Sequence, residues 1–205
     1  MKERLLIFDF DGTIADTRAV YYHAIGNELR FLGYKEKDID RAVNLGLSLK
    51  KTLKNLGLGF LTRWFLHARV YKRVKAHSVE IRKCRDVDSI RQLKDRKILV
   101  TNSLKEFALP ILKHLKLREA FSEIYGSEDF DDKAGFISNY LKTRKMDKKQ
   151  CYYIGDRVAD IKLARKVGVN SVVIAGKCAW DSRQELLEAK PDFILDDIKS
   201  LRKIL

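Results

Sequence analysis

The 205-residue sequence has only three cysteines and no long hydrophobic run. Cys84, Cys151 and Cys178 are odd in number and widely spaced, which excludes a metal-knuckle pattern, and we expect reduced thiols in a cytoplasmic protein. No apolar stretch reaches the length of a membrane span. The first residues lead directly into an apolar strand without a small-residue cleavage site, so we expect no signal peptide.

Internal repeats and low-complexity stretches are also absent from the sequence. The length fits one domain, or one domain with a sizeable insertion, and is sufficient to bury a core. Apolar residues make up 45% of the chain and charged residues 34%, which is typical of a globular protein.

The basic charge of the chain is concentrated in one segment. The formal net charge is +14, from 42 Lys and Arg against 28 Asp and Glu. Residues 17–85 hold 16 of the basic and 5 of the acidic residues, a net +11, which leaves +3 for the rest of the chain. A basic surface attracts phosphates, nucleic acid or lipid headgroups, although an ordinary solvated face rich in lysine has the same composition.

Hydrophobic periodicity predicts the order of strands and helices. Short apolar runs predict strands near residues 5–9, 97–101, 123–125, 150–154, 171–174 and 192–195. Helical spacing predicts helices near residues 17–32, 38–45, 48–56, 60–76, 78–84, 87–93, 105–115, 133–144, 160–167, 182–188 and from 197. Strands that alternate with helices indicate an α/β fold with a doubly wound parallel sheet, interrupted by an all-helical insert.

The segment from Asp9 to Thr17 follows the first predicted strand and carries two nearby carboxylates. Asp9 and Asp11 stand two residues apart, so their side chains can point the same way at the strand end. Ligands of open α/β sheets bind beyond the carboxyl ends of the strands. Gly12 allows a sharp turn that brings backbone N–H groups near a ligand. A plain acidic turn after a strand is the competing interpretation.

Three further motifs stand at the ends of predicted strands or the starts of helices. Thr101 and Asn102 offer a hydroxyl and an amide that can bond phosphate oxygens, or cap the following helix. Lys133 begins a helix, where the helix dipole disfavours a cation, and this favours a functional role over a surface position. Asp156 and Asp160 lie four residues apart, so they can share one side of a helical turn or cap it.

Together these motifs resemble those of the haloacid dehalogenase superfamily, in the same order along the chain. The matching positions are Asp9 with Asp11, then Thr101, Lys133, and Asp156 with Asp160. The resemblance covers essentially the whole chain. It implies a Rossmann-like core at residues 1–16 and 86–205 and a small helical cap at residues 17–85, as in phosphoglycolate-phosphatase-like members.

The resemblance also implies an enzyme, a Mg²⁺-dependent phosphatase that hydrolyses a small phosphomonoester. In such an enzyme Asp9 is the nucleophile that forms an aspartyl-phosphate, and Asp11 is the general acid and base. The phosphoryl oxygens are held by Thr101, Asn102, Lys133 and backbone amides near Gly12. The metal ligands are the Asp9 carboxylate, the Asp11 backbone carbonyl and the carboxylates of Asp156 and Asp160.

Two departures from the family pattern leave some positions open. Ala134 follows Lys133 where relatives often have proline, so Lys142 and Lys145 remain rivals for the third motif. Arg157 takes the place of a small polar residue, from which it can reach substrate or bond the acids.

In the cap, Lys50 and Lys51 follow a break at residues 46–48, where caps of this family place a substrate-contacting loop, but they also fit ordinary exposed lysines.

Other functions remain open at this point: a haloacid dehalogenase, a sugar-phosphate phosphomutase, or a non-catalytic protein that binds anions or RNA through the basic insert. Asp11 argues against the dehalogenase, because an acid that protonates an alkoxide suits phosphate esters.

We expect a small phosphorylated metabolite as the partner of this protein. We expect no membrane partner, and we do not favour nucleic acid. For the oligomeric state we expect a monomer or a homodimer.

Overall fold

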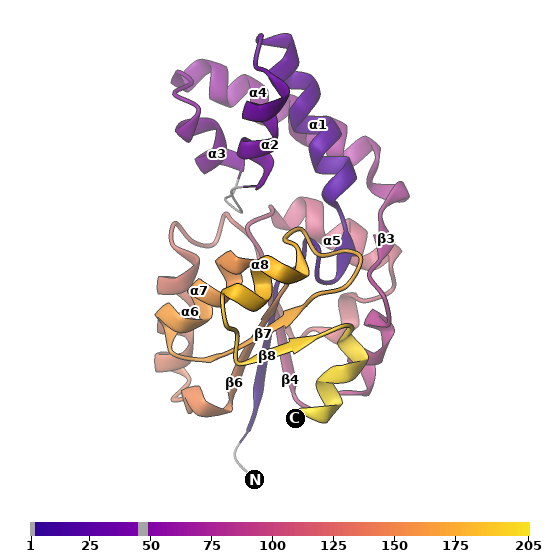
Figure 1. Cartoon of the computed structure of the whole chain (residues 1–205), viewed down its shortest axis with the longest axis vertical. Coiled ribbons are helices and arrows are strands. Elements are labelled where there is room, and N and C mark those ends of the chain that lie inside the picture. Colours follow the sequence, from indigo (N-terminus) through magenta and orange to yellow (C-terminus); the bar gives the residue numbers. More distant parts are fainter. Residues whose placement is uncertain (1–2, 45–48) are drawn as a thin grey trace.

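The computed structural model describes residues 3–44 and 49–205, and of Val43, Asn44 and Lys50 only the backbone. Two parts lie one above the other in Figure 1: a sheet flanked by helices, and a helical cap over one end of that sheet. The start of β1 and the C-terminus lie near the opposite end of the sheet. Among the described residues, no helix has both the length and the apolar character needed to cross a bilayer.

The sheet is parallel and has six strands in the order β5-β4-β1-β6-β7-β8. Their bounds are β1 Leu5–Phe8, β4 Arg96–Val100, β5 Glu123–Tyr125, β6 Cys151–Gly155, β7 Asn170–Ile174 and β8 Phe193–Leu195. The predicted α/β fold class is therefore confirmed, and each predicted strand lies within one residue of an observed one. Because β1 is a central strand, residues that follow it are placed at the middle of the sheet edge.

The side chains of β1 point alternately to the two faces of the sheet and contribute to the hydrophobic core on each face. Leu5 and Ile7 pack with α6 (Lys133–Thr143), while Leu6 and Phe8 pack with α5 (Lys105–His114) and the two 3₁₀ segments Val87–Gln92 and Ile198–Lys203. All four β1 side chains are fully buried. A strand that is covered on both faces has a continuous run of apolar residues, and the sequence shows this pattern before Asp9.

The cap contains helices α1 Arg18–Phe31, α2 Glu36–Asn44, α3 Leu49–Asn55 and α4 Phe60–Ala76. The remaining core helices are α7 Val158–Val167 and α8 Arg183–Glu188. In the cap, α1 packs lengthwise on α4, where Glu28 accepts hydrogen bonds from Arg69 and Arg73 at 2.6 Å each. The predicted helices near residues 17–32, 38–45, 48–56 and 60–76 are confirmed over the described residues, but the break at 46–48 falls outside them.

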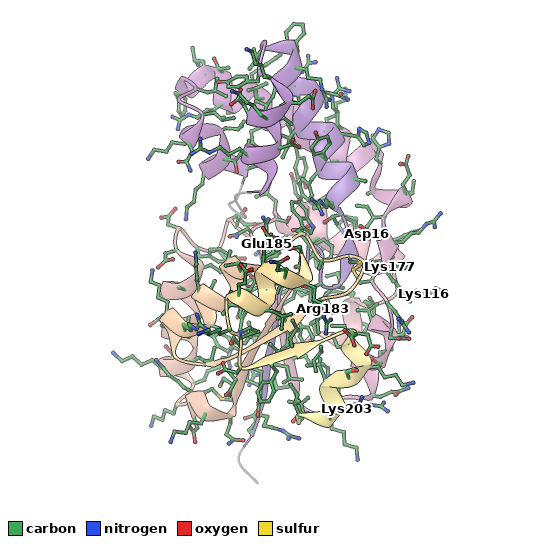
Figure 2. All side chains as sticks on the ribbon, viewed as in Figure 1. Asp16, Lys116, Lys177, Arg183, Glu185 and Lys203 are labelled. Atoms are coloured by element: carbon green, nitrogen blue, oxygen red, sulfur yellow. A yellow bond between two sulfur atoms is a disulfide. The ribbon has the colours of Figure 1, made fainter. Side chains whose placement is uncertain are left out.

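Two short strands join the cap to the core. β2 (Ala15–Asp16) pairs antiparallel with β3 (Arg82–Lys83), and Asp16 lies at this boundary in Figure 2. The predicted helix over residues 78–84 is wrong: the chain makes one 3₁₀ turn at Ser78–Glu80 and then enters β3. Pairing with β2, from far earlier in the chain, overrides the local helical pattern.

A disulfide between Cys84 and Cys178 corrects the expectation of three reduced thiols. Cys84 directly follows β3 and Cys178 lies in the loop between β7 and α8, so the bond ties the cap connection to the core. The two residues are 94 positions apart in the sequence, and spacing alone gives no sign of such a pair. Cys151 is a free, buried cysteine in β6.

Candidate active site

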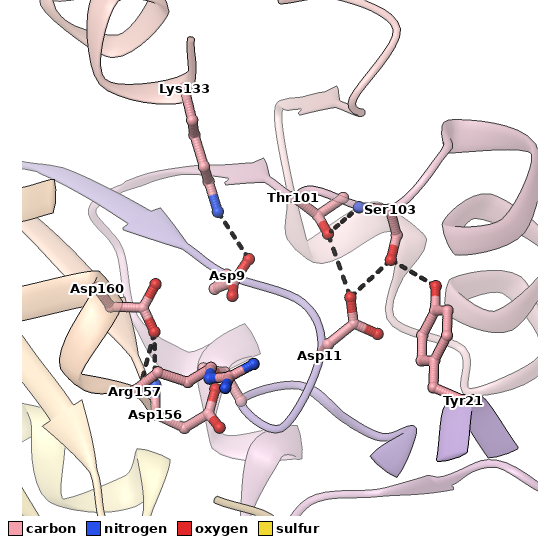
Figure 3. A network of polar contacts seen from close by, with 10 residues as sticks. Asp9, Asp11, Tyr21, Thr101, Ser103, Lys133, Asp156, Arg157 and Asp160 are labelled. Atoms are coloured by element: carbon pink, nitrogen blue, oxygen red, sulfur yellow. Dashed lines mark hydrogen bonds and ion pairs between the residues drawn. The ribbon is translucent and has the colours of Figure 1, made fainter. Parts of the chain in front are cut away.

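The predicted core residues of the site lie close together in Figure 3: Asp9 and Asp11 after β1, Thr101 after β4, Asp156 after β6, Lys133 on α6 and Asp160 on α7. A cavity of about 600 Å³ lies there between the core and the cap. Its lining includes Asp9, Asp11, Lys133 and Asp160 from the core and Lys51 from the cap. Segments that are far apart in the sequence therefore contribute to one chamber.

Asp9 is held by a lysine at the first position of α6. The Lys133 Nζ donates to Asp9 Oδ1 at 2.9 Å, and its ammonium lies 5.2 Å from the ring centre of Tyr153. The Lys133 side chain is only 6% exposed, so its charge is directed into the site. Lys142, in contrast, is exposed at the last turn of the same helix. The structure therefore brings Lys133, and not Lys142, to the first aspartate.

Among the described residues, the side-chain hydrogen-bond partners of Asp11 are hydroxyl groups. Thr17 Oγ1 donates to Asp11 Oδ1 at 2.7 Å, and Ser103 Oγ donates to Asp11 Oδ2 at 2.6 Å. The Tyr21 hydroxyl lies 2.6 Å from Ser103 Oγ and extends the chain of hydrogen bonds into α1. Burial and then repulsion from Asp9 raise the pKa of Asp11 to about 6, against the opposing effect of these hydroxyls. A carboxyl group in that range can both give and take a proton near neutral pH.

Thr101 and Asn102 follow β4, as expected. Thr101 is fully buried; its Oγ1 accepts a hydrogen bond from the Ser103 N–H at 3.0 Å and makes a long contact of 3.5 Å with Asp11 Oδ2. Asn102 and Ser103 line the cavity. The N-cap of α5 is Leu104, with no side-chain hydrogen bond, so the competing helix-cap interpretation of this motif is not supported.

Asp9, Asp156 and Asp160 form a compact carboxylate group, in which one oxygen from each lies within 4.8 Å of the others. Burial, and then repulsion from Asp160, raise the pKa of Asp156 well above its usual range. Burial, and then repulsion from Asp9, raise the pKa of Asp160 to about 7. Two buried carboxylates and the partly exposed Asp9 carboxylate carry excess negative charge, and such a group fits a hard divalent cation. The Asp11 carboxylate is turned to its hydroxyl partners and lies outside this group.

Two loops hold Asp156 in place. Thr13 Oγ1 donates to its Oδ1 at 2.9 Å, and the Trp180 backbone N–H donates to its Oδ2 at 2.8 Å. Gly12 adopts φ +74°, and a Cβ at that position would lie 2.3 Å from Asp156 Oδ2, so only glycine allows this approach. The Gly12 N–H already donates to the Ala15 carbonyl at 2.9 Å. Phosphate binding by other backbone amides of this turn stays a prediction.

Asp160 also organises the start of α7. Its Oδ2 accepts hydrogen bonds from the backbone N–H groups of Asp156 at 3.1 Å and Arg157 at 3.0 Å. The Asp160 carboxylate therefore fixes the backbone of residues 156–157 and also belongs to the carboxylate group with Asp9 and Asp156. The Arg157 guanidinium stacks over the Trp180 ring at 5.0 Å and lies 3.4 Å from Asp181, which holds it at the cavity wall.

The cap side of the cavity is largely apolar. Ile25, Val70 and Val74 from α1 and α4 line it opposite Phe107 of α5. Lys51 donates to the Asp131 backbone carbonyl and so bridges α3 to the core. The side chain of Lys50 lies outside the described residues, and its predicted role is neither supported nor opposed.

Several partners of the acids had not been predicted: Thr13, Thr17, Ser103 and Trp180, with Tyr21 bonded in turn to Ser103. Ser103 is the next residue after Asn102, so the hydroxyl in this motif was a usable signal. Thr17 occupies the N-cap position of α1, but its hydroxyl bonds Asp11 and makes no cap hydrogen bond. Trp180 acts through a backbone N–H from a distant loop, for which the sequence carries no signal.

Comparison with known proteins identifies relatives of this chain and the family that it matches. Residues 6–174 match the family described as haloacid dehalogenase-like hydrolase. A 5'-nucleotidase of Pseudomonas aeruginosa is 26% identical over 98% of this chain and 94% of its own length. A phosphoglycolate phosphatase of Aliivibrio fischeri is 23% identical over 98% of this chain and 96% of its own. A haloacid dehalogenase-like family hydrolase of Streptococcus pneumoniae shares the fold, with a TM-score of 0.79 at 21% identity and 99% coverage of both chains.

Proposed function

Because the chain belongs to the haloacid dehalogenase-like hydrolase family, we propose that it is a Mg²⁺-dependent phosphatase acting through an aspartyl-phosphate. The observation that carries the proposal is the contrast between two carboxylates that follow one strand. Asp9 faces the Lys133 ammonium, whereas Asp11 faces hydroxyl groups and has its pKa raised to about 6. Neighbouring acids in such different surroundings suit different steps of one reaction.

In the first half-reaction an Asp9 oxygen attacks the phosphorus of the substrate. The bond from phosphorus to the ester oxygen breaks, and protonated Asp11 gives its proton to the departing oxygen. Lys133 is placed to stabilise the negative charge on the phosphoryl oxygens as the transition state forms. Ser103 and Thr17 hold the Asp11 carboxyl in position through hydrogen bonds of 2.6 and 2.7 Å.

In the second half-reaction the Asp11 carboxylate takes a proton from water. The resulting hydroxide attacks the phosphorus of the acyl phosphate, the bond from phosphorus to Asp9 breaks, and inorganic phosphate and the free Asp9 carboxylate are released. Asp11 is protonated again at the end, so the cycle closes without any further proton donor.

The carboxylates of Asp9, Asp156 and Asp160 would hold the metal, with the Asp11 backbone carbonyl as a further ligand. An all-oxygen donor set favours Mg²⁺ over softer ions. When bound, the ion would supply positive charge that offsets repulsion among the carboxylates and the substrate phosphate. The raised pKa values of Asp156 and Asp160 support this assignment, because they arise first from burial and then from repulsion between neighbouring carboxylates, and a bound cation would offset both effects.

The substrate in this proposal is a small phosphorylated metabolite, in line with relatives named phosphoglycolate phosphatase and 5'-nucleotidase. Thr101, Asn102 and Lys133 would bind its phosphate group. We place the boundaries of the cap at residues 17–85, supported by the β2–β3 pair where its two connections meet.

We also propose a cytoplasmic location. The Cys84–Cys178 disulfide opposes it, because reducing compartments keep most thiols free. A thiol count on protein isolated and denatured without reductant tests this point. Three reactive thiols would fit a reducing compartment, and the Cys151 thiol alone would argue for an oxidising one.

The direct test of the proposed activity is release of phosphate from p-nitrophenyl phosphate by the purified chain. We expect turnover with Mg²⁺, none after treatment with EDTA, and recovery when Mg²⁺ is added back. Full activity in a verified metal-free sample would overturn the metal requirement. No phosphate release from a panel of phosphorylated metabolites, with Mg²⁺ present, would overturn the phosphatase itself.

A further inference from the structure

The first turns of α4 expose a group of large apolar side chains. Phe60, Leu61, Trp64 and Phe65 are 72%, 77%, 68% and 52% exposed, and together they form what we call the α4 patch. Spacings of three and four residues place Leu61, Trp64 and Phe65 on one side of the helix. Large apolar side chains that gather on a surface, as these do, mark an interaction site more often than isolated ones.

The α4 patch is not needed for packing within the protein. The other side of α4 supplies Leu66, Val70 and Val74, which are at most 2% exposed and pack inside the cap or line the cavity. The helix therefore has two apolar sides, and among the described residues only one of them is covered. In Figure 1, α4 lies in the cap, at the end of the molecule opposite the C-terminus.

Basic residues are frequent in the segment that carries the α4 patch. Residues 49–79, which include α3 and α4, contain eight Lys and Arg and no Asp or Glu. Lys54, Arg69 and Lys72 are exposed, and the Arg69 guanidinium lies 5.3 Å from the ring centre of Phe65. The nearest acidic partner on α1, Glu28, is buried between Arg69 and Arg73 and neutralises only part of this charge.

We propose that the α4 patch docks on an anionic lipid surface. Aromatic and aliphatic side chains flanked by Lys and Arg are the composition of helices that lie in a membrane interface. Their apolar groups enter the boundary between headgroups and acyl chains, while the cations attract anionic headgroups. This departs from our expectation of no membrane partner, which rested on the absence of a spanning segment; the α4 patch would lie on a bilayer without crossing it.

Charge and shape favour lipid over other occupants. A second copy of the chain would bring the same eight basic residues to the interface, and like charges oppose that pairing. Nucleic acid would satisfy the cations, but it offers no apolar medium for the aliphatic Leu61. A bilayer surface accepts both the apolar side chains and the cations, and it does not require them to stand in a fixed geometric arrangement.

The test is sedimentation of the full chain with vesicles of phosphatidylcholine, alone or with about 30% phosphatidylglycerol. We expect binding only to the anionic vesicles, weakened when salt rises from about 0.1 M to about 0.5 M. Trp64 is the exposed tryptophan and Trp180 is 9% exposed, so a blue shift of emission on binding would report on the α4 patch. The double variant Leu61→Ser/Trp64→Ser should lose at least about tenfold in apparent affinity.

Leu187→Ser is the matched control, because Leu187 is 51% exposed on α8 of the core, and it should bind as the wild type does. None of the substituted side chains lines the cavity, so unchanged hydrolase turnover or thermal unfolding would show that each variant is folded. Equal binding to neutral vesicles, no vesicle binding, or equal losses in both variants would overturn the proposal. So would a dimer or an RNA complex that the α4 patch variant abolishes while vesicles stay unbound.

Discussion

The core and the cap use charge in opposite ways. In the core, the important charges are buried and tightly bonded: Asp156 is fully buried, and Lys133 is 6% exposed and bound to Asp9. In the cap, a net +11 over residues 17–85 is spread over largely exposed side chains. Removing one core charge should therefore change chemistry or stability strongly, while removing one cap charge should change association weakly.

The largest effect is expected for Asp9→Asn. The amide cannot serve as the nucleophile, so turnover should fall by at least about 10⁴-fold with the fold intact. Steady-state phosphate release and thermal unfolding measure the two quantities. Asp16→Asn is the control, because Asp16 is an exposed acid of the nearby β2 strand. Substantial activity in Asp9→Asn, with deamidation excluded by mass spectrometry, would contradict the assignment.

Lys133→Ala should follow, with a loss of about 10²- to 10³-fold in kcat, the scale of losing one preorganised donor to a developing negative charge. Lys142→Ala is the control on the same helix: Lys142 is exposed in the last turn of α6, so this variant should keep the wild-type kcat. A loss in Lys142→Ala that is absent in Lys133→Ala would mean that the third motif is misplaced.

Two glutamates, each bonded to two arginines, extend the comparison to stability: Glu123 of the core, whose side chain is 22% exposed, and Glu28 of the cap, which is buried. In the core, burial raises the pKa of Glu123, but hydrogen bonds from Tyr125 and Tyr140, with help from Arg96 and Arg144, lower it to about 2. Its pKa lies below the unfolded value, so its stabilisation is complete above about pH 4.5 and is lost as pH falls through about 2.

Glu123→Gln should therefore lower the free energy of unfolding by about 3 kcal/mol near neutral pH, and by much less near pH 2, in urea titrations. The cap counterpart Glu28→Gln should cost less, because its partners Arg69 and Arg73 are 43% and 44% exposed and can turn to water. Equal losses, or a Glu123→Gln loss that persists at acid pH, would contradict this account.

Ser103→Ala should lower kcat about tenfold, because Asp11 loses a charge-assisted hydrogen bond of 2.6 Å. Ser122→Ala is the matched control, since its hydroxyl donates to the Lys97 carbonyl in the core at 2.9 Å. If kcat is unchanged in both variants, the hydroxyl chain from Tyr21 does not position the acid.

The smallest effect is expected in the cap. Lys50→Ala/Lys51→Ala should lower kcat/KM about two- to fivefold at low salt and hardly change kcat, because steering acts on association. The dependence of kcat/KM on salt should be shallower than in the wild type. A charge-matched core double, Lys142→Ala/Lys145→Ala, should keep the wild-type slope. Identical slopes in the two doubles would leave the cap charge without a steering role.

The core could be predicted from sequence because its signals are local. An apolar run before Asp9, and similar runs before Thr101 and Asp156, mark strands whose ends meet at one edge of the sheet. Lys133 was predicted by its order along the chain and its place at a helix start. The predicted fold class, family and enzyme class are confirmed, while the roles of individual site residues remain predictions.

The contacts that were not predicted join distant parts of the chain. Ser103 reaches Asp11 across 92 positions, and Trp180 reaches Asp156 through its backbone, where the side-chain type is irrelevant. The β2–β3 pair is two residues long in each strand, too short for a periodic pattern. The Cys84–Cys178 disulfide depends on three-dimensional proximity alone.

The central claim is that Asp9 carries the phosphoryl group during turnover. Its most direct test is acid quenching of the enzyme with Mg²⁺ and a phosphomonoester in steady state, followed by peptide mass spectrometry. The account predicts one added phosphoryl group on Asp9, absent without substrate and removed by hydroxylamine. A phosphoryl group on another residue, or phosphate release with no phosphoenzyme at any quench time, would contradict it.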